Sequence, residues 1–144
     1  MLSMLLMYGS FSVSAQAVFS TNEGAIKGYD PVAYFLDGKP IKGGEAYSFE
    51  YNGATWHFSS EKHLRLFRED PAKYVPQYGG YCAYGVASGY KVKIEPEAWA
   101  IIDNKLYLNY DLGTQKAWNK DREGFITRAN ANWPKLRNQV VDED

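Results

Sequence analysis

The feature that most constrains the fold is an Asn-Gly pair, Asn52-Gly53, between two segments in which residues alternate in character. Asparagine and glycine both tolerate positive φ, which the tight turn of a two-residue hairpin requires. The alternation on either side therefore predicts an antiparallel hairpin over residues 47–58. The expected register pairs Phe49 with Trp56 and Tyr47 with Phe58 on an aromatic core side. On the polar side it pairs Ser48 with His57 and Glu50 with Thr55.

The other elements follow from shorter patterns. A second hairpin is predicted over residues 98–109, around Asp103-Asn104. A helix of about three turns is predicted from Ser60 to Asp70, and one or two helices over residues 112–136, with Gly124 as an interruption. The stretch 74–90 reads as irregular. The prediction is a single α+β domain with a small antiparallel sheet of two β-hairpins packed against three or so helices.

Size and charge exclude some classes of function. A chain of 144 residues is long enough for one domain to bury a core without a metal or a disulfide. The net charge of -1 provides no basic surface for a phosphate backbone, so we expect no nucleic-acid partner. The single cysteine, Cys82, cannot form an intramolecular disulfide. One cysteine and two histidines are also fewer than the four ligands that a structural zinc site usually needs.

The first residues indicate the compartment. Residues 1–17 carry no charged side chain, begin with an apolar run and end in Ala15-Gln16-Ala17, a small-residue cleavage pattern. We expect a signal peptide, export to the periplasm or beyond, and a mature domain over 18–144 that begins near Val18. The alternative is an apolar segment that packs on the domain or on a second copy of the chain. In the second case the protein would form a homo-oligomer. The run is too short to span a membrane.

Several motifs together resemble the YHS domain family. They are Asp30-Pro31-Val32, the aromatic hairpin that continues into Ser59-Ser60, and the helix pattern with His63, Phe67, Pro71 and Tyr74. The resemblance extends over about residues 26–136 and is greatest to a longer, stand-alone bacterial branch, whose later half carries segments such as Gly79-Gly80-Tyr81-Cys82-Ala83. It implies a small soluble or exported domain and a metal ion as ligand, because short YHS domains and the related TRASH domains carry cysteines at fixed motif positions.

This chain departs from the short domains at those cysteine positions. Ala33 follows Asp30-Pro31-Val32, and Ser59 and His63 stand at the two cysteine positions of the helix motif. Alanine and serine offer no thiolate, on which selection of Cu(I) and many zinc sites rests. Only Cys82, from the later half of the chain, could supply a sulfur.

Three residues are therefore candidate ligands of copper or zinc: Cys82, His63 and His57. Cys82 is alternatively a buried structural thiol or a site of intermolecular pairing. His63 lies near the apolar face of its helix and is alternatively a half-buried histidine with a backbone partner. His57 lies on the polar face of the hairpin, where a solvated or hydrogen-bonded histidine is the simpler interpretation. We expect a metal site only if Cys82 and His63 converge.

Three loop tyrosines are the candidate ligand-binding cluster: Tyr78, Tyr81 and Tyr84. They support the alternative hypothesis, a metal-free interaction or dimerisation module. The chain has no phosphate-binding loop, no His-Glu-x-x-His motif and no Gly-x-Ser-x-Gly motif, so we do not expect an enzyme. A thiol enzyme remains a third hypothesis, and it requires Cys82 beside a histidine with a lowered thiol pKa.

Overall fold

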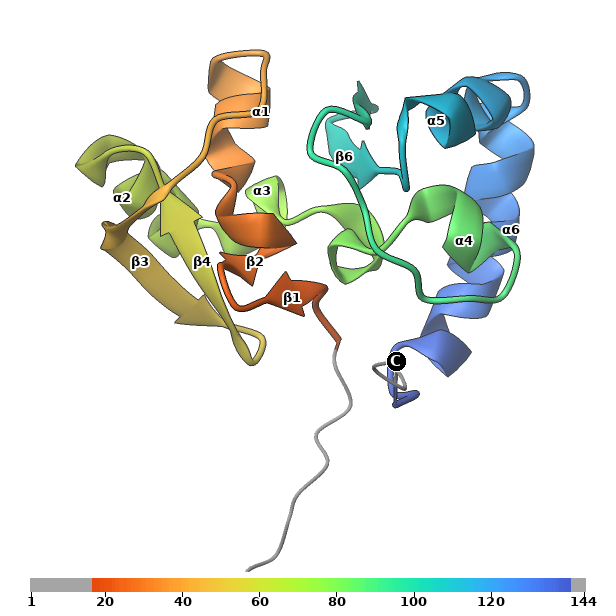
Figure 1. The fold of residues 1–144 in the computed structure, drawn as a ribbon, viewed down its shortest axis with the longest axis horizontal. Coiled ribbons are helices and arrows are strands. Elements are labelled where there is room, and N and C mark those ends of the chain that lie inside the picture. The colour runs from red at the N-terminus through yellow and green to blue at the C-terminus, as the bar shows by residue number, and fades with distance from the viewer. Residues whose placement is uncertain (1–16, 141–144) are drawn as a thin grey trace, which may run out of the picture.

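The strands pair only with their neighbours in the chain. The computed structural model describes residues 17–140 (Figure 1). Within them the strands form three separate antiparallel pairs: β1 (Ser20–Thr21) with β2 (Gly24–Ala25), β3 (Gly44–Tyr51) with β4 (Ala54–Phe58), and β5 (Trp99–Ile102) with β6 (Lys105–Leu108). The α+β class and both long hairpins are confirmed, although the hairpins stay separate rather than joining into one sheet. Residues 1–16, most of the predicted signal peptide, lie outside the described residues.

Six α-helices and two 3₁₀ turns connect and cover the strand pairs in the described part of the chain. They are η1 (Ile26–Gly28), α1 (Pro31–Leu36), α2 (Glu61–Glu69), α3 (Pro71–Tyr74), η2 (Gln77–Gly80), α4 (Ala83–Ala87), α5 (Leu112–Asn119) and α6 (Arg122–Leu136). The stretch 74–90, predicted to be irregular, therefore contains η2 and α4. Across residues 17–140, every helix is too short or too polar to cross a bilayer.

The β3–β4 hairpin has the predicted register near its turn but not at its far end. Asn52 and Gly53 have φ of 52° and 75°, and Phe49 pairs with Trp56. Between Gly44 and Ser48 the register shifts through a bulge, so Phe58 pairs with Gly44 and not with Tyr47. The predicted Tyr47–Phe58 pair is wrong because the extra residues of a bulge reset the alternation of the strand. Tyr47 is consequently 38% exposed.

The helices begin where side chains can accept hydrogen bonds from free backbone amides. Ser60 accepts from the His63 N–H at the start of α2, as its place before Glu61 predicted. Asp121 accepts from the Gly124 N–H and begins α6. The break between α5 and α6 therefore lies before Arg122, and the predicted interruption at Gly124 is wrong, because Gly124 is in the first turn of a capped helix.

Two clusters of buried side chains divide the core. One surrounds Phe67 of α2, whose ring contacts four other aromatic rings: Phe49, Tyr51, Trp56 and Phe58. The other surrounds Trp118 of α5 and includes Tyr78 and Tyr107. The first cluster also includes Cys82 at the start of α4 and Leu106 and Leu108 of β6, so it extends beyond the β3–β4 hairpin. Figure 1 shows α2 and this hairpin at one end of the long axis, and α4, α5 and α6 at the other. The β1–β2 hairpin and η2 lie between them.

Candidate functional site

A buried carboxylate at the start of α1 organises the first half of the protein. Pro31 occupies the first helical turn, where its missing N–H costs nothing, and this leaves Asp30 in an extended conformation as the N-cap. Oδ1 of Asp30 accepts hydrogen bonds from the backbone N–H groups of Val32 and Ala33, at 2.8 and 3.2 Å. Asp30 has no exposed surface, so these bonds replace those that water would make.

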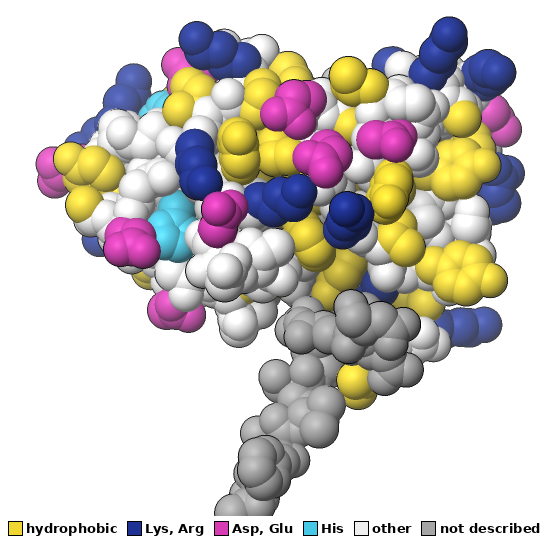
Figure 2. Space-filling view, viewed as in Figure 1, with side chains coloured by type: hydrophobic (Ala, Val, Ile, Leu, Met, Phe, Trp, Pro, Cys, Tyr) yellow, Lys and Arg dark blue, Asp and Glu magenta, His cyan; other side chains and the backbone are white. Residues whose placement is uncertain are grey.

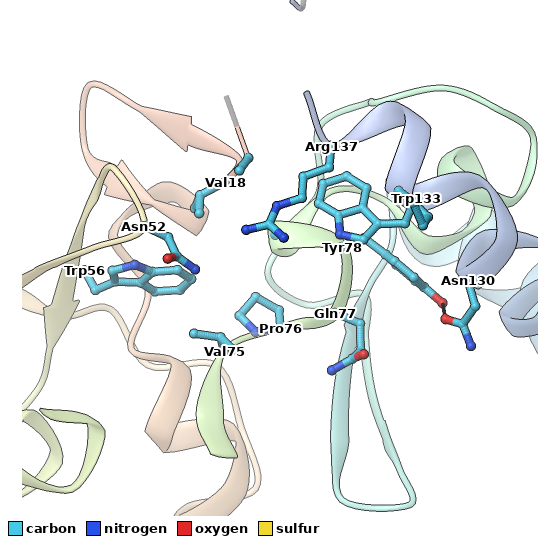
Figure 3. Close-up of a pocket in the computed structure, with 13 residues that line it drawn as sticks. Val18, Asn52, Trp56, Val75, Pro76, Gln77, Tyr78, Asn130, Trp133 and Arg137 are labelled. Atoms are coloured by element: carbon cyan, nitrogen blue, oxygen red, sulfur yellow. Dashed lines mark hydrogen bonds between the residues drawn. The ribbon is translucent and has the colours of Figure 1, made fainter. Parts of the chain in front are cut away.

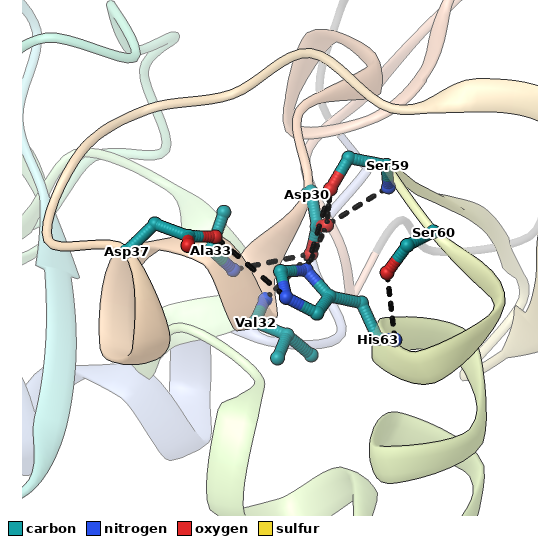
Figure 4. A network of polar contacts seen from close by, with 7 residues as sticks. All are labelled: Asp30, Val32, Ala33, Asp37, Ser59, Ser60 and His63. Atoms are coloured by element: carbon teal, nitrogen blue, oxygen red, sulfur yellow. Dashed lines mark hydrogen bonds and ion pairs between the residues drawn. The ribbon is translucent and has the colours of Figure 1, made fainter.

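The second oxygen of Asp30 connects α1 to α2 (Figure 4). Oδ2 accepts from the Ser59 backbone N–H at 2.9 Å and from the Ser59 hydroxyl at 2.7 Å. It also accepts from Nδ1 of His63 at 2.6 Å, which is in the short range of charge-assisted hydrogen bonds. Five donors therefore surround one buried carboxylate, and neither of its oxygens is free to hold another ligand.

This arrangement sets the tautomer of His63. Because the proton of a neutral imidazole lies on Nδ1, facing Asp30, the lone pair lies on Nε2. Nε2 is 3.6 Å from Oδ2 of Asp37, the residue that ends α1. The His63 side chain is 10% exposed and that of Asp37 is 40% exposed, so the two atoms meet at the edge of the buried network. Nε2 and the Asp37 carboxylate are the available ligand atoms.

The three positions at which the short domains carry cysteines meet at this carboxylate. The Ala33 N–H, the Ser59 hydroxyl and the His63 ring all donate to Asp30. None of these three positions carries a thiol, and their polar groups form one hydrogen-bonded network. Within residues 17–140, no group of three or more His, Cys, Asp or Glu side chains is arranged around a metal position. The residues present do not fit a thiolate centre.

Cys82 is the N-cap of α4, and its side chain is buried in the core cluster that also contains Phe67. Its Sγ accepts from the backbone N–H groups of Gly85 and Tyr110, at 3.4 and 3.1 Å, and its S–H donates to Oδ1 of Asn109 at 3.5 Å. None of these partners belongs to the Asp30 network, and α4 is far from α2 along the axis in Figure 1. The structure therefore does not bring Cys82 and His63 together.

Burial raises the pKa of the Cys82 thiol, and the hydrogen bonds from Gly85 and Tyr110 only partly oppose this shift. Because the thiolate is the reactive form, we expect iodoacetamide at neutral pH to alkylate folded Cys82 at least about tenfold more slowly than the unfolded chain. The rate is measured by mass spectrometry in buffer and in concentrated urea. A folded protein that reacts as fast as the unfolded one would contradict this and restore the thiol-enzyme hypothesis.

His57 occupies a third location, separate from both His63 and Cys82. It lies on β4 opposite Ser48, as predicted, and is half-buried. Its ring covers Gly24 of β2, where an added Cβ would lie 2.5 Å from Cδ2 of the imidazole. The three candidate metal ligands thus occupy three different places, and the described contacts give His57 a packing role between two hairpins.

The three candidate loop tyrosines point mainly inward. Tyr78 and Tyr81 are 5% and 2% exposed, and Tyr84 is half-buried with its ring 4.7 Å from that of Phe125. The Tyr78 hydroxyl donates to Oδ1 of Asn130 at 2.9 Å, and burial raises the pKa of this phenol, which keeps it neutral. Their burial does not favour an interaction surface built on these side chains.

Two residues of the site were missed by the sequence reasoning. Asp30 enters the sequence analysis only as part of the Asp30-Pro31-Val32 motif, and Asp37 is not among its candidate residues. A local signal existed for Asp30, since an aspartate before a proline that begins a helix is a typical N-cap. For Asp37 there was none, because its approach to His63 depends on the packing of α1 against α2.

Comparison with known proteins agrees with the motif evidence. Residues 32–78 match the family model of the YHS domain. This range includes α1 except for Pro31, the β3–β4 hairpin, α2 and α3, and it contains His63 and Asp37. Searches of curated proteins and of solved structures found no significant match.

Proposed function

We propose, for a chain that contains a YHS domain at residues 32–78, that this domain binds one divalent transition-metal ion, Zn²⁺ or Cu²⁺, through Nε2 of His63 and the carboxylate of Asp37. The observation that carries the proposal is the 3.6 Å separation of these two acceptor atoms. An imidazole lone pair and a carboxylate oxygen that face each other can both coordinate one metal ion, whereas a proton on Nε2 would make the two groups an ion pair.

The distance suits a shared ion better than a direct bond. A separation of 3.6 Å is longer than a hydrogen bond, although it lies within the distance of an ion pair between a protonated His63 and Asp37. Ligands about 2.0–2.2 Å from a tetrahedral zinc ion lie roughly 3.4 Å from each other. The two atoms are therefore close to the spacing of neighbouring ligands, and the exposure of Asp37 leaves room for water at the remaining positions.

Asp30 supports this role without touching the ion. Metal-binding histidines commonly donate their second ring N–H to a carboxylate, which holds the ring in place and increases its basicity. The 2.6 Å bond from Nδ1 of His63 to Asp30 has this form. Asp30 thus acts as a positioning residue.

The ligand atoms also determine which metals are expected. Nitrogen and carboxylate oxygen suit Zn²⁺ and Cu²⁺, whereas Cu(I) prefers sulfur ligands. The nearest candidate sulfur, that of Cys82, is buried among hydrogen-bond partners outside the Asp30 network. We therefore expect little binding of Cu(I) at this site.

Isothermal titration of the full chain with Zn²⁺ and Cu²⁺ tests the proposal. We expect one ion per chain, and a loss of affinity of about tenfold or more in Asp37→Asn, which removes the ligand charge but keeps the shape of the side chain. Asp37 is partly exposed, so this variant should fold normally. His57→Gln is the matched control, because it changes a histidine outside the network.

Two results would overturn the proposal. One is the absence of a binding heat for both ions. The other is metal binding that Asp37→Asn leaves unchanged. If Cys82→Ser abolished that binding, the metal site would have to include Cys82 instead of Asp37.

A further inference from the structure

A separate cavity lies between the two halves of the protein (Figure 3). Its volume is about 410 Å³, within the range of small-molecule sites. The β3–β4 turn contributes Asn52, the η2 region contributes Pro76 and Tyr78, and α6 and the residue after it contribute Trp133 and Arg137. None of the residues of the Asp30 network lines it, so this cavity is distinct from the proposed metal site.

Arg137 gives the cavity its charge. It is the only charged residue among the described residues that line the cavity. Figure 3 shows its guanidinium directed across the opening from the end of α6 toward the side of Asn52. Its side chain forms no hydrogen bond or ion pair with the described residues, whereas its backbone carbonyl accepts from Nζ of Lys91 at 3.0 Å, which holds this end of the helix. Within residues 17–140, the Arg137 guanidinium therefore has no hydrogen-bond or ion-pair partner, and its backbone is held in place at the cavity.

The wall beside Arg137 is aromatic and rigid. The Trp133 ring lies 6.1 Å from that of Tyr78, and the Tyr78 hydroxyl is bonded to Asn130 of the same helix as Trp133. Tyr78 also has φ of 59°, an unusual conformation for a bulky residue. Such backbone strain persists only where the surrounding structure enforces it. The wall is thus held in place before any ligand arrives.

We propose that this cavity binds a small organic anion with a planar apolar body, of the class of aromatic carboxylates. The Arg137 guanidinium pairs with the carboxylate in a two-pronged hydrogen bond, and the planar body packs against Trp133. The Asn52 and Gln77 amides at the cavity supply further donors and acceptors. Because no aspartate or glutamate lines the cavity among the described residues, an anion meets no repulsion from its lining there.

The test compares a charged probe with its neutral isostere by isothermal titration of the full chain. The probes are naphthalene-2-carboxylate and naphthalene-2-carboxamide. We expect the carboxylate to bind about tenfold more tightly, which is the effect of one charge-assisted pair at a partly exposed site. In Arg137→Gln the two probes should bind alike. Arg128→Gln, which removes an arginine from another part of the same helix, should keep the preference.

Three results of this titration would overturn the proposal. They are the absence of carboxylate binding at millimolar probe, equal affinity for both probes in the unaltered protein, or a preference that survives in Arg137→Gln. Performing the titration with a metal chelator, and again with Asp37→Asn, separates this result from the metal site. Carboxylate binding that is unchanged under both conditions supports an independent cavity.

Discussion

Replacing Asp30 with alanine is expected to lower the free energy of unfolding by about 3–5 kcal/mol, because the change leaves buried donors without an acceptor. The carboxylate has no exposed surface and accepts from five donors. Removing it deprives α1 of its N-cap and leaves the Ser59 and His63 donors unpaired. The link between α1 and α2 is lost in the same step.

Urea denaturation, followed by circular dichroism, measures this effect. Asp37→Asn is the control, since Asp37 is partly exposed and its neutral isostere should change the stability by less than about 0.5 kcal/mol. A loss of less than about 1 kcal/mol in Asp30→Ala would show that the network contributes little to folding. The interpretation of Asp30 as the organiser of this site would then be untenable.

Truncation of Phe67 to alanine is expected to cost a similar amount, about 3–5 kcal/mol, for a different reason. Phe67 is fully buried, and its ring centroid lies 5.0 to 6.2 Å from those of four aromatic neighbours on the β3–β4 hairpin. Alanine would remove the contacts of all four rings and leave a cavity that rigid aromatic side chains cannot easily fill.

The same urea denaturation measures the Phe67→Ala effect. Leu112→Ala is the control, because Leu112 is 62% exposed and its truncation creates no cavity in the core. We expect its effect to stay within about 0.5 kcal/mol. A Phe67→Ala variant as stable as Leu112→Ala would mean that the hairpin and α2 do not share one core.

Local features of the fold were predictable because each depends on neighbouring residues. The Asn52-Gly53 turn, the cap at Ser60 and the second hairpin around Asp103-Asn104 all appear where the sequence indicates them. The bulge before Ser48 was not predictable, since it depends on how β3 packs and not on alternation alone. This is why Tyr47 lies outside the core although its position in the pattern placed it inside.

The candidate site likewise has features that the sequence predicts and features that only the tertiary structure determines. The motifs predicted the resemblance to the YHS domain, whose family model matches residues 32–78, and the helix that carries His63. They also showed that positions 33, 59 and 63 hold no cysteine. Only the tertiary structure decided which groups meet. It gave Cys82 hydrogen-bond partners outside the Asp30 network and brought Asp30 and Asp37 to the two nitrogens of His63. Turns and helix caps depend on hydrogen bonds between residues a few positions apart, so the sequence predicts them. The set of residues around His63 depends instead on how α1 packs against α2, and no local sequence pattern specifies that packing.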